Sequence, residues 1–311
     1  MILRARHPHA LAAMAMLAWG LAYVPSAWLI EDVPPFLAAG ARLTAGGLVV
    51  VIVLLAIGQG IMPRVGVAAL AVVAVMQTAV FYGATFWGIE RLGAGLAAVL
   101  SNLDPIFVAA LGVIVLRERL GRWQWVGLGV GLLGAAVVVW DGPLWPPSLS
   151  WEALVVVGGS LAWAVATMVV AKGVRGVGSP LALAGWQMAL GGVLLLLFGA
   201  LTEEVPAGAV GGREVALVAW LAVVGSAFPA VAYYVALRGA PAGEVSAWFF
   251  LIPVIGVLTA WPLLGEAPTL QLAVGLAGVA AGLWLVVTPR GTLSSKLRKT
   301  IGRAPDLGKN P

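Results

Sequence analysis

Residues 179–200 read SPLALAGWQMALGGVLLLLFGA, a stretch of 22 residues without one charged side chain. An α-helix rises about 1.5 Å per residue, so this stretch can cross the hydrocarbon core of a bilayer, which is roughly 30 Å thick. Nine further stretches are predominantly apolar, namely residues 9–29, 36–58, 64–88, 93–116, 122–140, 150–172, 213–236, 243–263 and 269–288. The sequence therefore predicts an all-α integral membrane protein with ten transmembrane helices.

Composition indicates that lipid, rather than water, surrounds most of this chain. Of its 311 residues, 61% are apolar and only 10% are charged, whereas soluble domains carry about 25% charged residues. The 41 glycines suit membrane helices, in which small residues let two backbones approach closely. The net charge of +5 comes from short loops and one tail rather than from a folded basic face, so we expect no nucleic-acid partner.

The absence of cysteine and the position of the histidines exclude several classes of chemistry. The chain has no cysteine, which excludes disulfides, thiolate metal sites and cysteine nucleophiles. Its two histidines, His7 and His9, lie near the N-terminus, which excludes histidine chemistry within the membrane. No Gly-x-x-x-x-Gly-Lys-Ser/Thr loop is present to bind ATP. We therefore expect no enzyme activity, no metal and no cofactor.

The distribution of cations predicts the orientation of the chain in the membrane. With the N-terminus in the cytoplasm, all but three of the 18 lysines and arginines are cytoplasmic. The exceptions are Arg91 and Arg213 on the outer side and Arg42 within a span. Cytoplasmic loops of membrane proteins carry an excess of Lys and Arg. We therefore expect a multi-pass protein of a bacterial inner membrane, with both termini in the cytoplasm and a basic cytoplasmic tail over residues 290–311.

The two halves of the chain resemble each other. In a comparison of residues 1–145 with residues 146–289, Pro105, Glu118, Gly127 and Gly134 match Pro253, Glu266, Gly275 and Gly282, always 148 positions apart. Each half holds five predicted spans, and five is odd, so the second half must enter the membrane from the opposite side. This predicts an inverted repeat, an architecture that in transporters places the substrate site near the midplane between the halves.

Each half also ends in a pattern that resembles the EamA domain of the drug/metabolite transporter superfamily. In the first half the pattern is Leu103-Asp104-Pro105-Ile106-Phe107, then Leu116-Arg117-Glu118-Arg119-Leu120, then Gly127 to Gly134. In the second half it is Leu251-Ile252-Pro253-Val254-Ile255, then Leu264-Gly265-Glu266, then Gly275 to Gly282. The resemblance covers about residues 10–288 and implies a ten-helix secondary carrier, often an exporter of amino acids or related metabolites. Two departures are Arg117, where the family commonly has glycine, and the acidic Asp104.

Two charged side chains fall within predicted spans, where charges are costly and usually functional. Asp104 lies about 16 Å into its span at 1.5 Å per residue. An ionised carboxylate at this depth needs a cation or water, and otherwise takes up a proton. It could carry protons or contact a substrate amine, or it could pair with Arg42 or cap the chain beside Pro105. Arg42 could bind a substrate carboxylate, act in gating, pair with Asp104, or extend its head to the outer interface.

Neutral polar groups and aromatic rings complete the candidate site. The further substrate-binding or gating candidates are Gln77, Trp19, Tyr23, Ser101, Tyr82, Trp163, Trp186, Gln187 and Trp248. Ser101 shares the face of Asp104 at helical spacing, and Gln187 is the repeat counterpart of Arg42. The rings could line an aromatic pocket, although core packing explains any single ring equally well. Pro105 and Pro253 each remove a backbone hydrogen bond, which predicts a break beside a cavity or a packing kink.

These observations favour a secondary transporter that moves a small polar metabolite by alternating access. The resemblance adds that the substrate is an amino acid or a related compound and that the direction is export. Protons are a candidate coupling ion through Asp104, and we expect a monomer in a lipid bilayer. The alternative is a passive pore for small solutes, which should show rings of like polar groups along its path.

Overall fold

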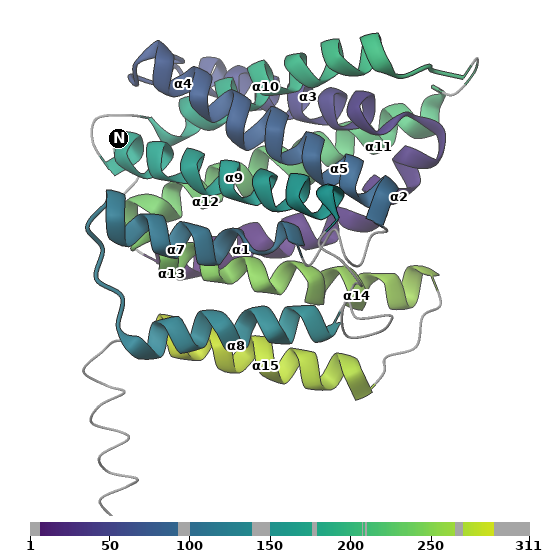
Figure 1. Cartoon of the computed structure of the whole chain (residues 1–311). Helices are drawn as coiled ribbons and strands as arrows, with labels where there is room; N and C mark the ends of the chain where they lie inside the picture. The colour runs from purple at the N-terminus through teal and green to yellow at the C-terminus, as the bar shows by residue number, and fades with distance from the viewer. Residues whose placement is uncertain are drawn as a thin grey trace, which may run out of the picture.

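The computed structural model describes residues 7–92, 100–138, 150–175, 179–206, 208, 210–264 and 270–288, and every regular element in them is helical (Figure 1). In chain order the elements are α1 (Pro8–Leu21), α2 (Tyr23–Asp32), α3 (Pro35–Ala56), α4 (Val67–Val73), η1 (Ala74–Val80), α5 (Phe81–Leu92), α7 (Asp104–Val115), α8 (Arg122–Val138), α9 (Trp151–Arg175), α10 (Pro180–Thr202), α11 (Gly212–Ala222), η2 (Val223–Ala227), α12 (Phe228–Gly239), α13 (Ala242–Ser246), η3 (Ala247–Phe250), α14 (Leu251–Leu264) and α15 (Leu270–Val287). The predicted all-α fold class is confirmed.

Many of these helices are long and apolar enough to cross a membrane. Six helical runs meet both conditions, namely Pro8–Asp32, Pro35–Ala56, Val67–Gly88, Trp151–Arg175, Pro180–Thr202 and Gly212–Gly239. Two shorter apolar helices are Asp104–Val115 and Ala273–Val287. The count of ten spans and the cytoplasmic position of both termini stay predictions.

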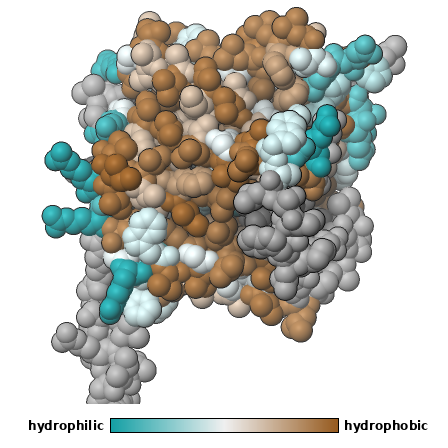
Figure 2. Space-filling view, in the orientation of Figure 1, coloured by the Kyte–Doolittle hydropathy of each residue, from teal (hydrophilic) through white to brown (hydrophobic). Residues whose placement is uncertain are grey.

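The outer surface of the bundle is apolar. Figure 2 shows hydrophobic residues across the sides of the helices and hydrophilic residues gathered toward their ends. Large side chains such as Ile52 and Leu201 are 61% and 85% exposed. An apolar surface of this extent is unfavourable in water, and it suits helices that pack side by side within a bilayer.

Glycines let two pairs of helices approach closely. A Cβ atom on Gly47 of α3 would collide with the backbone of Ala189 in α10. Between α8 and α15, a Cβ on Gly127 would lie 2.7 Å from the carbonyl oxygen of Gly282. The small-residue faces of α8 and α15 thus pack against each other within the chain, as glycine-rich faces of membrane helices commonly do.

Two helical runs contain π-helical segments at corresponding places in the two halves. The segment η1 interrupts the run from α4 to α5, and η2 interrupts the run from α11 to α12. A Cβ on Gly191 of α10 would collide with Thr78 in η1, and a Cβ on Gly46 of α3 would lie 2.8 Å from the Cβ of Ser226 in η2. The glycines match at an offset of 145, and Thr78 and Ser226 at 148. Each half therefore packs a glycine against the π segment of the other half.

The predicted span over residues 93–116 is interrupted just before Pro105, where the sequence predicts a helix break. The chain turns at Asn102 and Leu103, and α7 begins at Asp104, while residues 93–99 lie outside the described residues. Pro105 has no N–H to donate to a preceding carbonyl, so it fits the first turn of a helix. The hydroxyl of Ser160 in α9 donates instead to the carbonyl oxygens of Leu100 and Ser101, at 2.8 and 3.1 Å.

The second half changes its helix type at the corresponding place. The 3-10 segment η3 ends one residue before α14, whose third residue is Pro253. The predicted span over residues 243–263 is helical throughout, but it comprises α13, η3 and α14. Both proline-containing spans are thus irregular just before the proline, and in the first half this irregular backbone faces a cavity.

The two ends of the bundle are named here for one residue at each. At the Glu118 end, Arg175 at the end of α9 donates to Glu118 Oε1 at 2.8 Å. The connection from α7 to α8, which includes Glu118, lies on the left in Figure 1. At the Arg213 end, Arg213 Nη1 at the start of α11 lies 3.0 Å from Asp32 Oδ2 at the end of α2. Polar contacts between helix ends therefore occur at both ends of the bundle.

Candidate functional site

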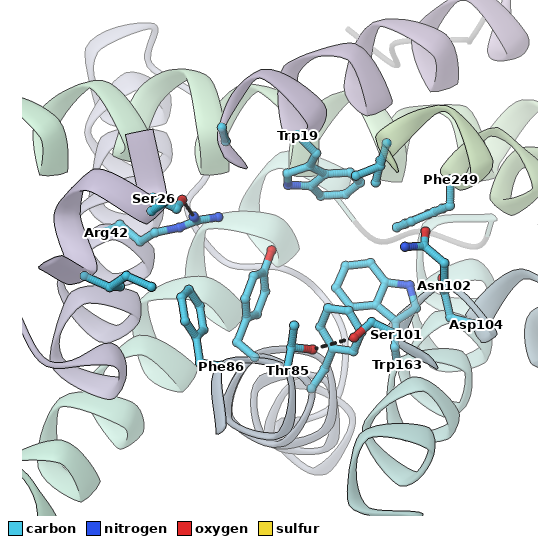
Figure 3. Close-up of a pocket in the computed structure, with 16 residues that line it drawn as sticks. Trp19, Ser26, Arg42, Thr85, Phe86, Ser101, Asn102, Asp104, Trp163 and Phe249 are labelled. Carbon is cyan, nitrogen blue, oxygen red and sulfur yellow. Dashed lines mark hydrogen bonds between the residues drawn. The ribbon is translucent and has the colours of Figure 1, made fainter. Parts of the chain in front are cut away.

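A cavity of about 190 Å³ lies among α1, α2, α3, α5, α7, α9 and the η3–α14 segment. Its aromatic walls are Trp19, Phe81, Tyr82, Phe86, Trp163 and Phe249. Its polar lining is Ser26, Arg42, Thr85, Ser101, Asn102 and Asp104 (Figure 3). The cavity therefore combines a largely apolar wall with a few polar groups, as small-molecule sites commonly do. It is called the central pocket below.

One connected cluster of rings lies in the central pocket, formed by Trp19, Phe81, Tyr82, Trp163 and Phe249. Trp19 and Trp163 meet edge to face with ring centroids 5.9 Å apart, and Trp163 lies 6.5 Å from Tyr82 and 5.6 Å from Phe249. Aromatic pairs prefer such separations and inclined arrangements. Of the aromatic candidates from the sequence, the structure brings Trp19, Tyr82 and Trp163 together at this pocket. Phe249 joins them from η3.

Arg42 lies in α3, buried at the side of the central pocket. It is only 5% exposed, so its head does not extend to a lipid–water interface. Nη1 donates to Ser26 Oγ at 2.7 Å, Nη2 donates to the carbonyl oxygen of Gly225 at 3.4 Å, and the guanidinium lies 5.6 Å from the centroid of the Tyr82 ring. Nε has no hydrogen-bond partner. No carboxylate among the described residues pairs with this cation.

Asp104 lines the same pocket from the first turn of α7. It is 1% exposed, and its Oδ2 atom has no hydrogen-bond partner. The hydrogen bonds of Arg42 go to Ser26 and Gly225, so the two charged candidates line one pocket without pairing with each other. A buried carboxylate oxygen without a hydrogen-bond partner is costly, and such atoms are tolerated most often where a ligand or an ion binds.

Small polar groups lie beside Asp104. Thr85 and Ser101 share a hydrogen bond between their hydroxyl oxygens at 3.3 Å, and Asn102 is buried next to them in the turn before α7 (Figure 3). Ser101 is a candidate from the sequence, whereas Thr85 and Asn102 are not. The available signal for Thr85 was its spacing of three and four residues from Tyr82 and Phe81, which places all of them on one helical face.

Gln77 and Gln187 lie outside the central pocket, at a smaller cavity of about 10 Å³. The hydroxyl of Tyr234 donates to Gln77 Oε1, and Thr78 Oγ1 donates to Gln187 Oε1 at 2.5 Å. Both hydrogen bonds join the first half to the second. Gln77 Nε2 and the hydroxyl of Ser226 have no partner there. A volume of about 10–15 Å³ is enough for one water molecule, so this cavity is too small for a metabolite.

The remaining candidates lie away from the central pocket or outside the described side chains. Trp186 Nε1 donates to the carbonyl oxygen of Ile61 at 2.8 Å, near the Glu118 end. Trp248 Nε1 donates to His9 Nδ1 at 3.3 Å, also away from the pocket. The side chains of Tyr23 and Pro253 lie outside the described residues. Sequence reasoning gave the depth of these residues but not the direction in which each side chain points.

The central pocket extends toward only one end of the bundle. Its lining includes Ser26 and Ile30, in the last turns of α2 at the Arg213 end. On α9 its lining stops at Trp163, and further toward the Glu118 end Val170 and Val174 are fully buried. At that end Glu118 accepts hydrogen bonds from Arg175 and from the backbone N–H of Ala242 at 2.9 Å. The bundle is thus closed on the side of Glu118.

Comparison with known proteins gives consistent results along nearly the whole chain. The model of the EamA-like transporter family matches residues 8–140 and again residues 150–288. YvbV of Bacillus subtilis (strain 168), described as an uncharacterized transporter, is 27% identical over 285 residues, which cover 89% of this chain and 90% of YvbV. YedA of Escherichia coli (strain K12), described as an uncharacterized inner membrane transporter, is 26% identical over 251 residues, or 80% of each chain.

A solved crystal structure has the same fold. It superposes with a TM-score of 0.77 at 22% sequence identity, and the match covers 90% of this chain and 97% of the chain in that structure. The likeness to that structure concerns the fold alone. The twofold match to the family model and the relatives named as transporters carry the assignment: the chain belongs to the EamA-like transporter family of the drug/metabolite transporter superfamily, and it is a multi-pass membrane transporter.

Proposed function

We propose that this protein is a secondary transporter that exports a small polar metabolite, an amino acid or a related compound, and that the central pocket is its substrate site. The observation that carries the proposal is that two buried charged side chains, Arg42 and Asp104, line one aromatic pocket and do not form an ion pair with each other. Binding sites of this kind fix an organic ligand with a few polar groups and enclose it with apolar surface.

The proposed mechanism is alternating access between two five-helix halves, residues 1–145 and 146–289, arranged as an inverted repeat. With both termini in the cytoplasm of a bacterial cell, the Glu118 end is the cytoplasmic end, and the pocket opens to the outside. The contacts between glycines and π segments support this exchange, because each half meets the other through corresponding residues. In inverted repeats, the two access states arise when the halves exchange conformations around a fixed site.

Substrate movement needs an energy source outside the chain itself. A gradient of the substrate suffices for facilitated transport, and protons are the proposed coupling ion. Asp104 is the group we propose for proton transfer, because it is buried, lines the pocket and has no ion-pair partner among the described residues. We further propose that one chain, as a monomer in the inner membrane, contains the complete pathway.

Counterflow in proteoliposomes tests the proposal. Vesicles containing the purified protein are preloaded with unlabelled amino acids or related metabolites, and labelled compound is added outside. We expect saturable exchange with one class of compound. Arg42→Gln and Asp104→Asn should each lower the exchange at least about tenfold, because each loses a charge-assisted contact. The matched control is Arg213→Gln at the outer rim, which should exchange at the normal rate.

Two results would contradict the proposal. Flux that rises linearly with concentration and shows no counterflow would identify a passive pore. Normal exchange in both pocket variants would show that the central pocket is not the substrate site.

A further inference from the structure

The two charged side chains of the central pocket lie at opposite ends of it. Figure 3 shows Arg42 with Ser26 at one end, and Asn102 and Asp104 at the other. Arg42 uses its terminal nitrogens for Ser26 and Gly225. The pocket therefore has a cationic end and an acidic end that a ligand meets separately.

Each end keeps a buried polar atom without a partner. At one end this atom is Arg42 Nε, a hydrogen-bond donor, and at the other it is Asp104 Oδ2, an acceptor. Because buried polar groups in folded proteins are almost always paired, the two atoms call for a ligand with an acceptor at the first end and a donor at the second. A carboxylate suits the guanidinium, and an ammonium suits the aspartate.

Rings separate the two ends. The guanidinium of Arg42 lies over Tyr82, the ring of Tyr82 is 6.5 Å from that of Trp163, and Trp163 is 5.9 Å from Trp19. A flat apolar group can stack on such rings, which are a favourable surface for aromatic ligands. The pocket volume of about 190 Å³ also suits one ring with short substituents, since a cavity of about 150 Å³ holds a benzene molecule.

We infer that the substrate carries its acidic group and its basic group at opposite ends of a ring-sized apolar body. An α-amino acid with an uncharged side chain bears both groups on one carbon atom, so it can reach Arg42 or Asp104 but leaves the other without a partner. Sites built to pair with two polar groups reject ligands that supply only one of them. This inference rests on the proposed function and narrows its substrate class to amino acids with separated charges.

Two isomers test this inference directly. Phenylalanine and 4-(aminomethyl)phenylacetic acid contain the same atoms, including one ring, one carboxylate and one ammonium, and differ in where the charges lie. Binding to the purified full-length protein is followed by tryptophan fluorescence, because Trp19 and Trp163 line the pocket. We expect 4-(aminomethyl)phenylacetate to bind at least about tenfold more tightly than phenylalanine, since it gains one further charge-assisted hydrogen bond.

Variants at each end show whether both contacts produce the preference. Arg42→Gln and Asp104→Asn should each reduce the preference to within about twofold, because each removes one of the two charges. Arg42→Lys keeps the charge and should retain part of the preference, which separates a lost contact from a misfolded protein. The matched controls are Arg213→Gln and Asp32→Asn, an arginine and an aspartate outside the pocket, and both should keep the full preference.

The outcomes separate this inference from the proposed function. Equal affinity for the isomers, tighter binding of phenylalanine, or an unchanged preference in both pocket variants would overturn the inference. Failure of both isomers to bind, in vesicles that still exchange other amino acids, would also overturn it while the carrier function stands. If neither isomer nor any metabolite of the counterflow panel is exchanged, the proposed function fails together with the inference.

Discussion

Arg175 donates a hydrogen bond of 2.8 Å to Glu118, a residue 57 positions earlier in the chain. The carboxylate of Glu118 also accepts hydrogen bonds from two backbone N–H groups at the start of α13, those of Ala242 at 2.9 Å and Gly243 at 3.5 Å. One carboxylate therefore joins the loop before α8, the end of α9 and the start of α13. These contacts hold the bundle closed on the side away from the pocket opening.

Removal of this carboxylate should open the Glu118 end. Because the chain has no cysteine, a single Val174→Cys substitution reports on access without any background labelling. Val174 is fully buried, so a membrane-impermeant maleimide added on the side of the Glu118 end should react slowly. Glu118→Ala removes the acceptor of the backbone N–H groups of Ala242 and Gly243, which costs about 1–3 kcal/mol for each unpaired group. The substitution should therefore raise the labelling rate of Val174→Cys about tenfold.

The reciprocal measurement uses the open end of the pocket. Ile30 lines the pocket at the Arg213 end, and an Ile30→Cys variant should lose labelling from that side when Glu118→Ala is added. The control is Glu204→Ala, an exposed acid at the Arg213 end, which should leave both rates unchanged. Val174→Cys that labels equally fast with and without Glu118 would show that these contacts do not close the bundle.

The glycines opposite the π segments should tolerate no side chain. A Cβ on Gly46 would lie 2.8 Å from both Ser226 Cβ and the carbonyl oxygen of Ala222. Gly46→Ala and Gly191→Ala should each lower the free energy of unfolding by about 1–3 kcal/mol, the usual cost of overpacking. The measurement is thermal unfolding in detergent. Gly129→Ala is the control, because a Cβ there meets no atom within 4 Å, and an equal loss in all three variants would refute the packing argument.

Replacement of Arg117 by glycine should stabilise the protein. Its φ is +55°, a left-handed conformation that costs most side chains roughly 1–2 kcal/mol and costs glycine little. Arg117→Gly should therefore raise the free energy of unfolding by about 1 kcal/mol, measured as a higher Tm. Arg119→Gly removes a nearby arginine without a positive φ, and it should bring no gain. A lower Tm for Arg117→Gly would mean that the arginine side chain contributes more than its backbone conformation costs.

A proton gradient should drive transport through Asp104 if protons are the coupling ion. When the gradient is imposed across proteoliposomes with the outside more acidic, it should speed the efflux of preloaded substrate through the native protein. The side chain of Asp104→Asn cannot bind and release a proton, so the same gradient should have no effect on the residual efflux through this variant. An equal response of the two proteins would assign coupling to another group, and the matched control is Asp32→Asn, which should respond like the native protein.

Apolar length predicted the helices well because the bilayer imposes it directly. A span such as residues 179–200 must satisfy its backbone internally, and only a helix does so within one segment. The structure places α10 at Pro180–Thr202, close to that prediction. The resemblance between the halves likewise pointed to positions that make corresponding contacts, since Gly127 packs against Gly282 and Gly134 packs against Gly275.

Features set by tertiary packing could not be predicted in this way. The π segments η1 and η2 lie where a neighbouring helix packs closely, and their residues have no distinct periodicity. The turn at Asn102 is stabilised by the Ser160 hydroxyl from a helix of the other half. For the tryptophans, depth alone did not distinguish Trp163, which lines the pocket, from Trp186, which donates to Ile61. Which way a side chain points depends on its neighbours in space.

The close packing of α8 against α15 has a consequence for biosynthesis. The glycine face of α8, which includes Gly127, is covered by Gly282, a residue made much later in translation. α8 ends at Val138 and α15 begins at Leu270, so at about 5–20 residues per second α8 waits on the order of ten seconds for its partner. During this interval lipid or the insertion machinery must cover the face. A truncation before α15 would leave α8 permanently without its partner and mark the chain for quality-control proteolysis.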